Sequence, residues 1–330
     1  MNPRNNKLFS IVIPVYYNEQ NLTETIPQLL ALKADLPGLD IELIFVDDGS
    51  GDASLKLLRE YQQRRTNEIK VVKLTRNFGS MSAIQAGFTV ATGDCVGMIS
   101  ADLQDPPELF LEMIKHWEQG TSKAIFAIRQ DREEPILQKF FSNSYYALIR
   151  QFALSGYPNG GFDFFLIDKQ VVNDLNHIRE KNTNLMTLIY WLGYKPVMIP
   201  YVRKQRGKGI SRWTLTKKIK LFVDTFAAFS FFPIRILSVI GFLVALGAFL
   251  YGLFVLVYWG LYGAEVRGWV PTIVVLSFTS GIQMAMLGVL GEYLWRTLDE
   301  VRNRPPFIID AIYDGTDGDG KPKDQQAEQS

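Results

Sequence analysis

The first 130 residues alternate short apolar runs with longer stretches in which apolar residues recur at helical spacing. We expect strands at residues 8–15, 41–46, 69–74, 95–99 and 124–128. We expect helices between them at residues 20–32, 53–64, 80–90 and 108–118. Because strands that alternate with helices are joined by right-handed crossovers, the pattern predicts an α/β domain with a Rossmann-like, mostly parallel sheet.

Two much longer apolar runs follow in the C-terminal third of the chain. No charged residue occurs at 236–262 or at 270–291, and each run exceeds the roughly 20 residues that cross a ~30 Å hydrocarbon core. We therefore expect a hairpin of two transmembrane helices, at about residues 235–262 and 270–294. Two buried helices of a large soluble domain are the alternative.

Basic residues flank this expected hairpin at its two outer ends. They are Lys217, Lys218, Lys220 and Arg235 before the first run, and Arg296, Arg302 and Arg304 after the second. The connecting loop carries only Glu265 and Arg267. By the positive-inside rule, both termini and the α/β domain are expected in the cytoplasm. The N-terminal residues contain no long apolar core, so no signal peptide is predicted there.

Charge is distributed unevenly along the chain. With 35 Lys and Arg against 34 Asp and Glu, the net charge is +1, which excludes a uniformly basic nucleic-acid-binding protein. Residues 203–220 nevertheless contain eight cations and no acid. Residues 213–229 have the pattern of an amphipathic helix, which favours a membrane surface with anionic head groups. Residues 137–154 are also amphipathic and would either lie at that surface or pack on the sheet.

Polar residues collect after four of the expected strands, at 14–19, 47–50, 76–79 and 100–107. Because parallel strands end at one edge of a sheet, these clusters predict a ligand site there. The chain has no G-x-G-x-x-G after its first strand and no P-loop motif, which argues against dinucleotide and P-loop sites. It also lacks paired-cysteine and H-E-x-x-H patterns, so a bound metal would be held by oxygen atoms, which suits Mg²⁺ or Mn²⁺.

Five motifs occur in a fixed order: IVIPVYYNE, VDDGS, RNFG, ADLQDPPE and RGKGISRW. Together they resemble the inverting glycosyltransferases of family two, which have the GT-A fold. More narrowly, the chain is similar to the polyprenyl-phosphate glycosyltransferases, which include GtrB-like and dolichol-phosphate mannose synthase-like enzymes. The resemblance covers about residues 8–300. It implies transfer of a hexosyl group from a nucleotide sugar to polyprenyl (undecaprenyl) phosphate, with UDP-glucose as the expected donor and GDP-mannose as the alternative.

The resemblance also assigns residues to the donor. The positions matched to nucleotide binding are Pro14, Tyr16, Glu19, Asp47, Asp48 and Arg76. Asp102 and Gln104 match the metal-binding positions of a DxDxQ-type motif, and they would hold Mg²⁺ or Mn²⁺ against the diphosphate. The first acid of that motif is replaced by Ser100, so a lower metal affinity is expected.

On the acceptor side, the resemblance points to cations. The positions matched to the acceptor phosphate are Arg129, Lys139, Ser142, Arg206, Ser211 and Arg212. The group expected to act in catalysis is Asp102, Asp163, Arg129 and Arg206. Relatives often carry Arg where this chain has Phe165, so one expected cation is absent. A phosphate acceptor is already ionised at neutral pH, so the site needs cations that position it more than it needs a general base.

The expected organisation has four parts. Residues 1–210 form the cytoplasmic catalytic domain, 211–231 a juxtamembrane amphipathic helix, 232–296 the two transmembrane helices, and 297–330 a cytoplasmic tail that is disordered from residue 310. The membrane would be a bacterial-type plasma (inner) membrane, and polar and glycine residues in the second span are compatible with a homo-oligomer. A processive polysaccharide synthase is disfavoured, because Gln205 lies too far before Arg212 for its Q-x-x-R-W motif. A non-catalytic membrane anchor or transporter component is the alternative of another class.

Overall fold

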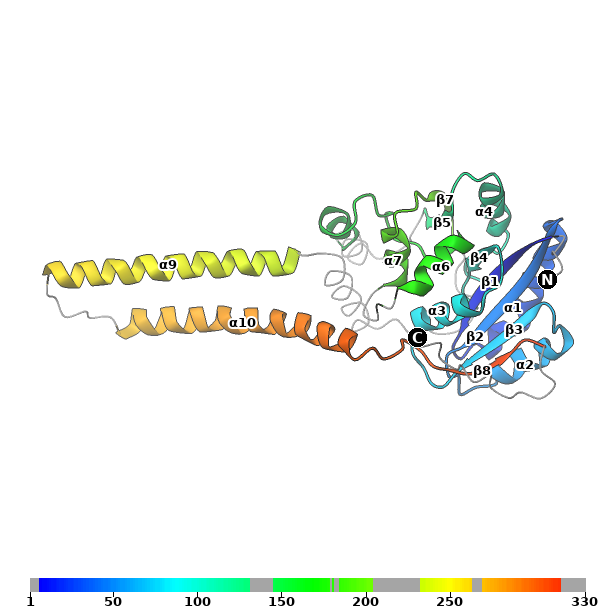
Figure 1. Ribbon diagram of the computed structural model, residues 1–330, viewed down its shortest axis with the longest axis horizontal. Helices are drawn as coiled ribbons and strands as arrows, with labels where there is room; N and C mark the ends of the chain where they lie inside the picture. The colour runs from blue at the N-terminus through cyan, green and yellow to red at the C-terminus, as the bar shows by residue number, and fades with distance from the viewer. Residues whose placement is uncertain are drawn as a thin grey trace, which may run out of the picture.

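The computed structural model describes residues 6–130, 145–178, 180, 184–203, 232–262 and 269–315. These residues form an α/β domain and two long helices that extend from it side by side (Figure 1). The predicted juxtamembrane helix at 211–231 lies outside the described residues.

One mixed sheet forms the centre of the domain. Its strands are β1 (Lys7–Val15), β2 (Leu39–Asp47), β3 (Ile69–Leu74), β4 (Cys95–Met98), β5 (Ala124–Arg129), β6 (Phe164–Asp168), β7 (Val197–Tyr201) and β8 (Ile309–Tyr313). In the described residues, they lie in the order β7-β5-β6-β4-β1-β2-β3-β8. The run β4-β1-β2-β3 is parallel, as predicted, and β5 pairs in parallel with β7. Strand β6 is antiparallel to β4 and β5, and β8 is antiparallel to β3.

Helices cover both faces of the sheet and so complete three layers (Figure 1). Helices α1 (Glu19–Ala31), α2 (Ser54–Arg64) and α4 (Leu109–Glu118) share one buried apolar cluster, and the short 3₁₀ turn η1 (Leu32–Asp35) adjoins it. Helices α3 (Ser80–Val90), α6 (Lys169–His177) and α7 (Leu185–Trp191) share the other. Successive side chains of a strand point to opposite faces, so Ile11 and Ile13 of β1 enter the first cluster and Val12 enters the second.

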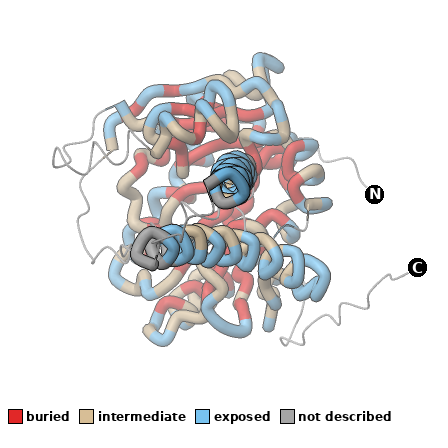
Figure 2. Tube along the Cα trace, turned by 90° about the vertical axis from the view of Figure 1, so that its left-hand side faces the viewer, coloured by how far each residue is buried: buried red, intermediate tan, exposed pale blue. Residues whose placement is uncertain are grey.

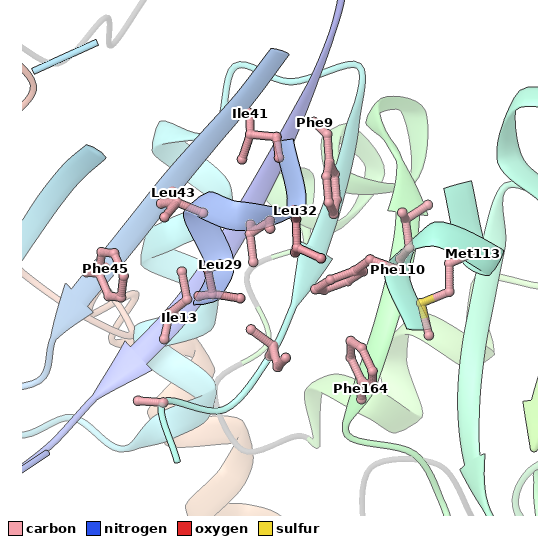
Figure 3. Packing of buried hydrophobic residues seen from close by; sticks show 14 of the residues in the cluster. Phe9, Ile13, Leu29, Leu32, Ile41, Leu43, Phe45, Phe110, Met113 and Phe164 are labelled. Atoms are coloured by element: carbon pink, nitrogen blue, oxygen red, sulfur yellow. The ribbon is translucent and has the colours of Figure 1, made fainter. Parts of the chain in front are cut away.

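Aromatic rings anchor the first cluster. Phe110 of α4 lies edge-to-face against Phe9 at 5.0 Å and against Phe164 at 4.7 Å between ring centroids (Figure 3). Such pairs add about 0.5–1.5 kcal/mol beyond the burial of their area. A Cβ on Gly97 of β4 would lie 2.4 Å from the Phe110 ring, so this strand position needs glycine. The packing fixes β4, whose loop carries the predicted metal ligands, against its neighbours.

The two long helices are α9 (Phe232–Tyr262) and α10 (Trp269–Val301). Among the described helices, only α9 contains a segment long and apolar enough to cross a membrane, residues Ile236–Val255, with a mean hydropathy of 2.3. None of that segment is buried, whereas the domain has a buried interior (Figure 2). The helices touch where a Cβ on Gly241 would lie 2.8 Å from Met286. The second span, expected in α10, stays a prediction.

Strand β8 corrects two expectations about the C-terminal segment. The chain was expected to be disordered from residue 310, yet Ile309–Tyr313 pairs with β3. An ion pair of 2.5 Å joins Lys73 to Asp310, and the Arg59 guanidinium lies 3.6 Å from the centre of the Tyr313 ring. These contacts outweigh the polar composition that suggested disorder. The catalytic domain therefore does not end at residue 210, because its sheet is completed after α10.

The amphipathic stretch at 137–154 is described only from residue 145. Residues 145–152 are helical, and Ile149 is fully buried in the cluster shared by α3, α6 and α7. Of the two possibilities for this stretch, packing on the sheet therefore holds for its described part.

Candidate active site

The predicted site residues collect at one edge of the sheet. Strands β1 to β4 are parallel, so the loops that follow them leave from the same edge. Strand β6 is antiparallel to both β4 and β5, so β5 runs in the same direction as β4. Strand β7 is parallel to β5 and shares that direction. Strand β4 lies between β1-β2-β3 on one side and β6-β5-β7 on the other. The loop after β4 therefore separates two parts of the candidate site, which we call half-sites. One lies at the ends of β1, β2 and β3, and the other lies beside β6, β5 and β7.

Asp47 ends β2 as a buried carboxylate with 1% exposure. Its Oδ2 accepts a hydrogen bond of 3.3 Å from the backbone N–H of Ser50, and its Oδ1 has no hydrogen-bond partner among the described residues. Burial raises the pKa of Asp47. A buried acceptor oxygen without a partner is costly, so this arrangement suits a donated N–H from a ligand. The match of Asp47 to nucleotide binding stays a prediction.

Asp48 contacts the next loop along the sheet. Its Oδ1 accepts a hydrogen bond of 2.7 Å from the backbone N–H of Phe78, and its Oδ2 accepts one of 2.9 Å from Gly79. Burial raises the pKa of Asp48 in spite of these contacts. Arg76 lies exposed on the same loop, with its guanidinium 4.2 Å from the centre of the Phe78 ring. Asp48 thus holds the loop of Arg76, and a direct contact between Asp48 and the nucleotide stays a prediction.

The loop after β1 is joined to the start of α2. Glu19 accepts a hydrogen bond of 2.9 Å from the backbone N–H of Ala53 through its Oε2. Tyr17 adopts a left-handed backbone with φ of 56°, and its ring lies edge-to-face on Tyr16 at 4.7 Å. Pro14 and Tyr16 are partly buried beside it. Glu19 therefore has a structural contact in addition to its predicted role in nucleotide binding.

The loop after β4 carries the predicted metal ligands. Ser100 Oγ lies 2.7 Å from Asp102 Oδ1 and 3.3 Å from Asp105 Oδ2. The backbone N–H of Gln104 approaches Asp102 Oδ1 at 3.4 Å. Leu103 between them has a φ of 48°, which turns the chain sharply. Asp102 and Gln104 are both partly exposed, and Asp105 is buried.

This donor set fits a hard divalent cation. Asp102 and Gln104 offer oxygen ligands, and the described residues contain no group of three His, Cys, Asp or Glu that could hold a metal by themselves. Mg²⁺ and Mn²⁺ suit such a site, because hard cations of this kind bind through one or two carboxylates and complete their shell with water and substrate phosphates. Ser100 supplies a neutral hydroxyl where a second acid is expected.

The other half-site is a cluster of two cations and two acids. The Arg129 guanidinium at the end of β5 donates a hydrogen bond to Asp163 Oδ2. The Nη1 of Arg203 lies 4.0 Å from the same oxygen. Its Nε lies 3.2 Å from Asp105 Oδ1, close enough for an ion pair but not aligned for a hydrogen bond. Tyr201 donates a hydrogen bond of 2.5 Å from its hydroxyl to Asp105 Oδ1. The cluster joins the loop after β4 to strands β5 and β7.

The pKa values in this cluster move with burial and with charge. Burial raises the pKa of Asp105, and the nearby Asp163 raises it further, while Arg203 opposes both. Burial also raises the pKa of Tyr201, and Asp105 adds to it. Burial alone would lower the pKa of Arg129, but Asp163 and Tyr201 outweigh it and the pKa rises. Arg129 is therefore a permanent cation at this edge.

Sequence reasoning missed Asp105, Tyr201 and Arg203 as site residues. Asp105 is part of the ADLQDPPE motif, which gave a signal for it. Phe165, at the position of the expected arginine, is fully buried in the core. The five remaining acceptor-side residues lie outside the described part of the chain: Lys139, Ser142, Arg206, Ser211 and Arg212.

Known proteins resemble this chain over most of its length. Residues 10–175 match the model of Glycosyl transferase family 2. The chain is 36% identical to the uncharacterized glycosyltransferase YkcC of Bacillus subtilis, over 92% of this chain and 94% of that protein. It is 32% identical to the SfII prophage-derived bactoprenol glucosyl transferase of Shigella flexneri, over 93% and 98%.

A third relative differs in the sugar that its name gives. The chain is 33% identical to the undecaprenyl-phosphate 4-deoxy-4-formamido-L-arabinose transferase of Pectobacterium carotovorum, over 92% of this chain and 93% of that protein. Each of these three matches covers more than nine-tenths of this chain. The family match and these relatives show that the chain, with its GT-A fold, belongs to glycosyltransferase family 2.

Proposed function

We propose that this chain transfers a hexosyl group from a nucleotide sugar to a polyprenyl phosphate, with inversion at the anomeric carbon. The main observation behind the proposal is that Arg129 and Arg203 both contact the Asp163 carboxylate. This pair of arginines lies next to the loop that carries Asp102. Two cations at this place suit an anionic acceptor next to a donor diphosphate. Relatives named for bactoprenol and undecaprenyl phosphate, which match over nearly their full length, support the same acceptor class.

The donor is held by the half-site on β1, β2 and β3. The Asp47 oxygen that has no partner among the described residues accepts an N–H of the base, and Pro14 and Tyr16, at the end of the neighbouring strand β1, contribute to the same nucleotide site. Arg76, on the loop held by Asp48, faces solvent and is available to the donor phosphates. A divalent cation, Mg²⁺ or Mn²⁺, on Asp102 and Gln104 would neutralise charge on the departing diphosphate.

The acceptor is held by the other half-site. Its phosphate is ionised at neutral pH, so an oxygen of that phosphate is the nucleophile and no side chain has to remove a proton. Arg129 and Arg203 orient it toward the anomeric carbon. The new bond forms between phosphate oxygen and anomeric carbon as the bond to the nucleoside diphosphate breaks. Attack from the face opposite the leaving group inverts that carbon, so the chemistry depends on positioning and electrostatics.

The long helices supply the membrane attachment in this proposal. Segment 236–255 of α9 is exposed and apolar, and α10 lies beside it (Figure 1). We infer that both helices cross a bacterial plasma (inner) membrane, with the catalytic domain and both termini in the cytoplasm, where basic flanks favour them. This places the site near the surface from which a polyprenyl phosphate is presented. A homo-oligomer formed through the helices is compatible with this arrangement.

The test uses the full chain in detergent with undecaprenyl phosphate and radiolabelled UDP-glucose. A lipid-soluble product carrying one sugar is expected, and it should disappear in Asp102→Ala and after chelation of divalent cations. Parallel reactions with GDP-mannose and other UDP-sugars identify the donor. Failure to form a lipid product from any nucleotide sugar would reject the proposal, and products of many sugars would favour a processive synthase. Full cellular function of Asp102→Ala would favour a non-catalytic anchor or transporter component.

A further inference from the structure

The loop after β4 has lost one of the two acids of the DxDxQ-type motif, and Ser100 stands in its place. A single carboxylate, that of Asp102, is left to hold a cation together with the Gln104 amide. The order of that carboxylate therefore depends on the groups that contact it. Ser100 is one of them, which raises the question of what holds Ser100.

Ser100 lies between two carboxylates. Its Oγ is 2.7 Å from Asp102 Oδ1 and 3.3 Å from Asp105 Oδ2. The hydroxyl has one proton, and Ser100 donates it to both carboxylates as a bifurcated hydrogen bond, mainly to Asp102 at the shorter distance. The contacts run in sequence from Asp105 through Ser100 to Asp102.

Asp105 is the fixed end of this sequence. Only 1% of it is exposed, and its Oδ1 accepts a hydrogen bond of 2.5 Å from the Tyr201 hydroxyl. The Arg203 Nε lies 3.2 Å from the same oxygen. Tyr201 is the last residue of β7 and stands in register with Arg129 of β5. Asp105 is thus held from the acceptor half-site, while its contact through Ser100 reaches the donor half-site.

We propose that Asp105 is a positioning residue that fixes the Asp102 carboxylate through Ser100. In this chain it supplies the order that an acid at position 100 would otherwise give. The proposal rests on the transfer function proposed above, in which Asp102 binds a divalent cation. The proposal has a second consequence. The Asp105 carboxylate would also fix the distance between the cation site and the two arginines of the acceptor half-site.

The experiment measures Mn²⁺ binding without turnover, by electron paramagnetic resonance of free Mn²⁺ titrated with the full chain in detergent. Asp105→Asn and Ser100→Ala are each expected to weaken Mn²⁺ binding by about 10–100-fold, as loss of a group that orients a ligand does. Asp40→Asn is the matched control, because Asp40 is an exposed acid that pairs with Lys33 outside the site. Its Mn²⁺ affinity should equal that of the unmodified chain.

A second pair of variants separates positioning from folding. In a Ser100→Asp background, a direct acid replaces the contact through the hydroxyl, so adding Asp105→Asn is expected to change Mn²⁺ affinity by less than about twofold. Equal losses in both backgrounds would overturn the proposal, as would Mn²⁺ binding that Ser100→Ala leaves unchanged. Ser100→Ala keeps Asp105 and its β7 partners, so it remains informative if Asp105→Asn does not fold. Absence of sugar transfer by the unmodified chain would reject the proposed function and leave these titrations valid.

Discussion

The Asp48 carboxylate accepts a hydrogen bond of 2.7 Å from the backbone N–H of Phe78 and so fastens the loop after β2 to the loop after β3. Its other oxygen holds Gly79 at 2.9 Å. Hydrogen bonds to a charged group are worth about 1.5–3 kcal/mol each, and the loop carries Arg76. This contact therefore bears on both stability and donor binding.

Replacing Asp48 by Ala removes both acceptors. We expect the free energy of unfolding to fall by about 3 kcal/mol, since two charge-assisted hydrogen bonds are lost but their effects are not fully additive. The KM for the nucleotide sugar should rise, because Arg76 loses its support. Asp48→Asn keeps one acceptor oxygen and should lose less. Urea denaturation of the three chains checks this, and equal losses for Ala and Asn would contradict it.

We expect the Asp47 carboxylate to lower the stability of the free protein and to favour binding of the nucleotide sugar. Asp47→Asn removes a buried charge, so we expect the free protein to gain about 1 kcal/mol at pH 7. Because burial raises the pKa of Asp47 in the folded chain, the charged form is the destabilising one. The gain should therefore shrink as the pH falls toward the ordinary value of 3.8 and the folded chain becomes protonated. The KM for the nucleotide sugar should rise at the same time. Thermal unfolding against pH checks the first expectation, and a gain that grows at low pH would refute it.

Gly49 and Gly38 form a matched pair for testing loop contact. Both have positive φ, at 71° and 88°. A Cβ on Gly49 would lie 2.8 Å from the backbone of Arg76 and Asn77, whereas one on Gly38 would meet nothing within 4 Å. Gly38→Ala should cost about 1–2 kcal/mol of backbone strain and leave the KM unchanged. Gly49→Ala should cost more and raise the KM for the nucleotide sugar by displacing Arg76. Calorimetry and donor kinetics distinguish them, and identical behaviour would argue against the contact.

Arg129 should affect the acceptor without affecting the donor. Arg129→Gln is expected to raise the KM for polyprenyl phosphate about tenfold or more, since a charge-assisted hydrogen bond is lost. The KM for the nucleotide sugar should change less than twofold. Arg65→Gln is the control, because Arg65 pairs with Glu68 away from the site, and it should change neither constant. A rise in the KM for the nucleotide sugar alone would contradict the assignment of Arg129 to the acceptor half-site.

Strand β8 should be required for a soluble, stable domain. Ending the chain after Ile308 leaves β3 as an open edge, and exposed strand edges promote aggregation. We expect this chain to aggregate in detergent and to unfold at a lower temperature. A chain that ends at Gly315 keeps β8 and should match the full chain in both respects. Size-exclusion chromatography and thermal unfolding check the difference, and two equally stable truncated chains would show that β8 is dispensable.

The strands that could be predicted share one property. Strands β1 to β5 form apolar runs, mostly buried on both faces, and such runs are recognisable in sequence; their predicted ends agree with the structure to within two residues. Strand β7 contains Pro200 and lies at the edge of the sheet, where proline is tolerated, so its pattern is weak. Strand β8 is short, and its pairing with β3 depends on residues more than two hundred positions away.

The site residues also differ in how far the sequence alone predicts them. Asp47 and Asp102 stand inside compact motifs, so the residue types and spacing already indicate their chemistry. Tyr201 meets Asp105 across 96 positions of sequence, and no local pattern connects them. Contacts of that kind follow from the order of strands in the sheet. The spacing within motifs therefore predicts ligands, and topology determines which side chains hold those ligands in place.

The return of the chain to the sheet as β8 also sets an order of events during biosynthesis. Lys73 and its partner Asp310 are 237 positions apart, with both long helices between them. At roughly 5–20 residues per second of translation, on the order of ten to fifty seconds pass before β3 can pair with β8. The catalytic sheet is thus finished only after the segments proposed to enter the membrane have been made. A ribosome-bound chain that stalls in α10 would carry a sheet that still lacks β8, with the edge of β3 unpaired.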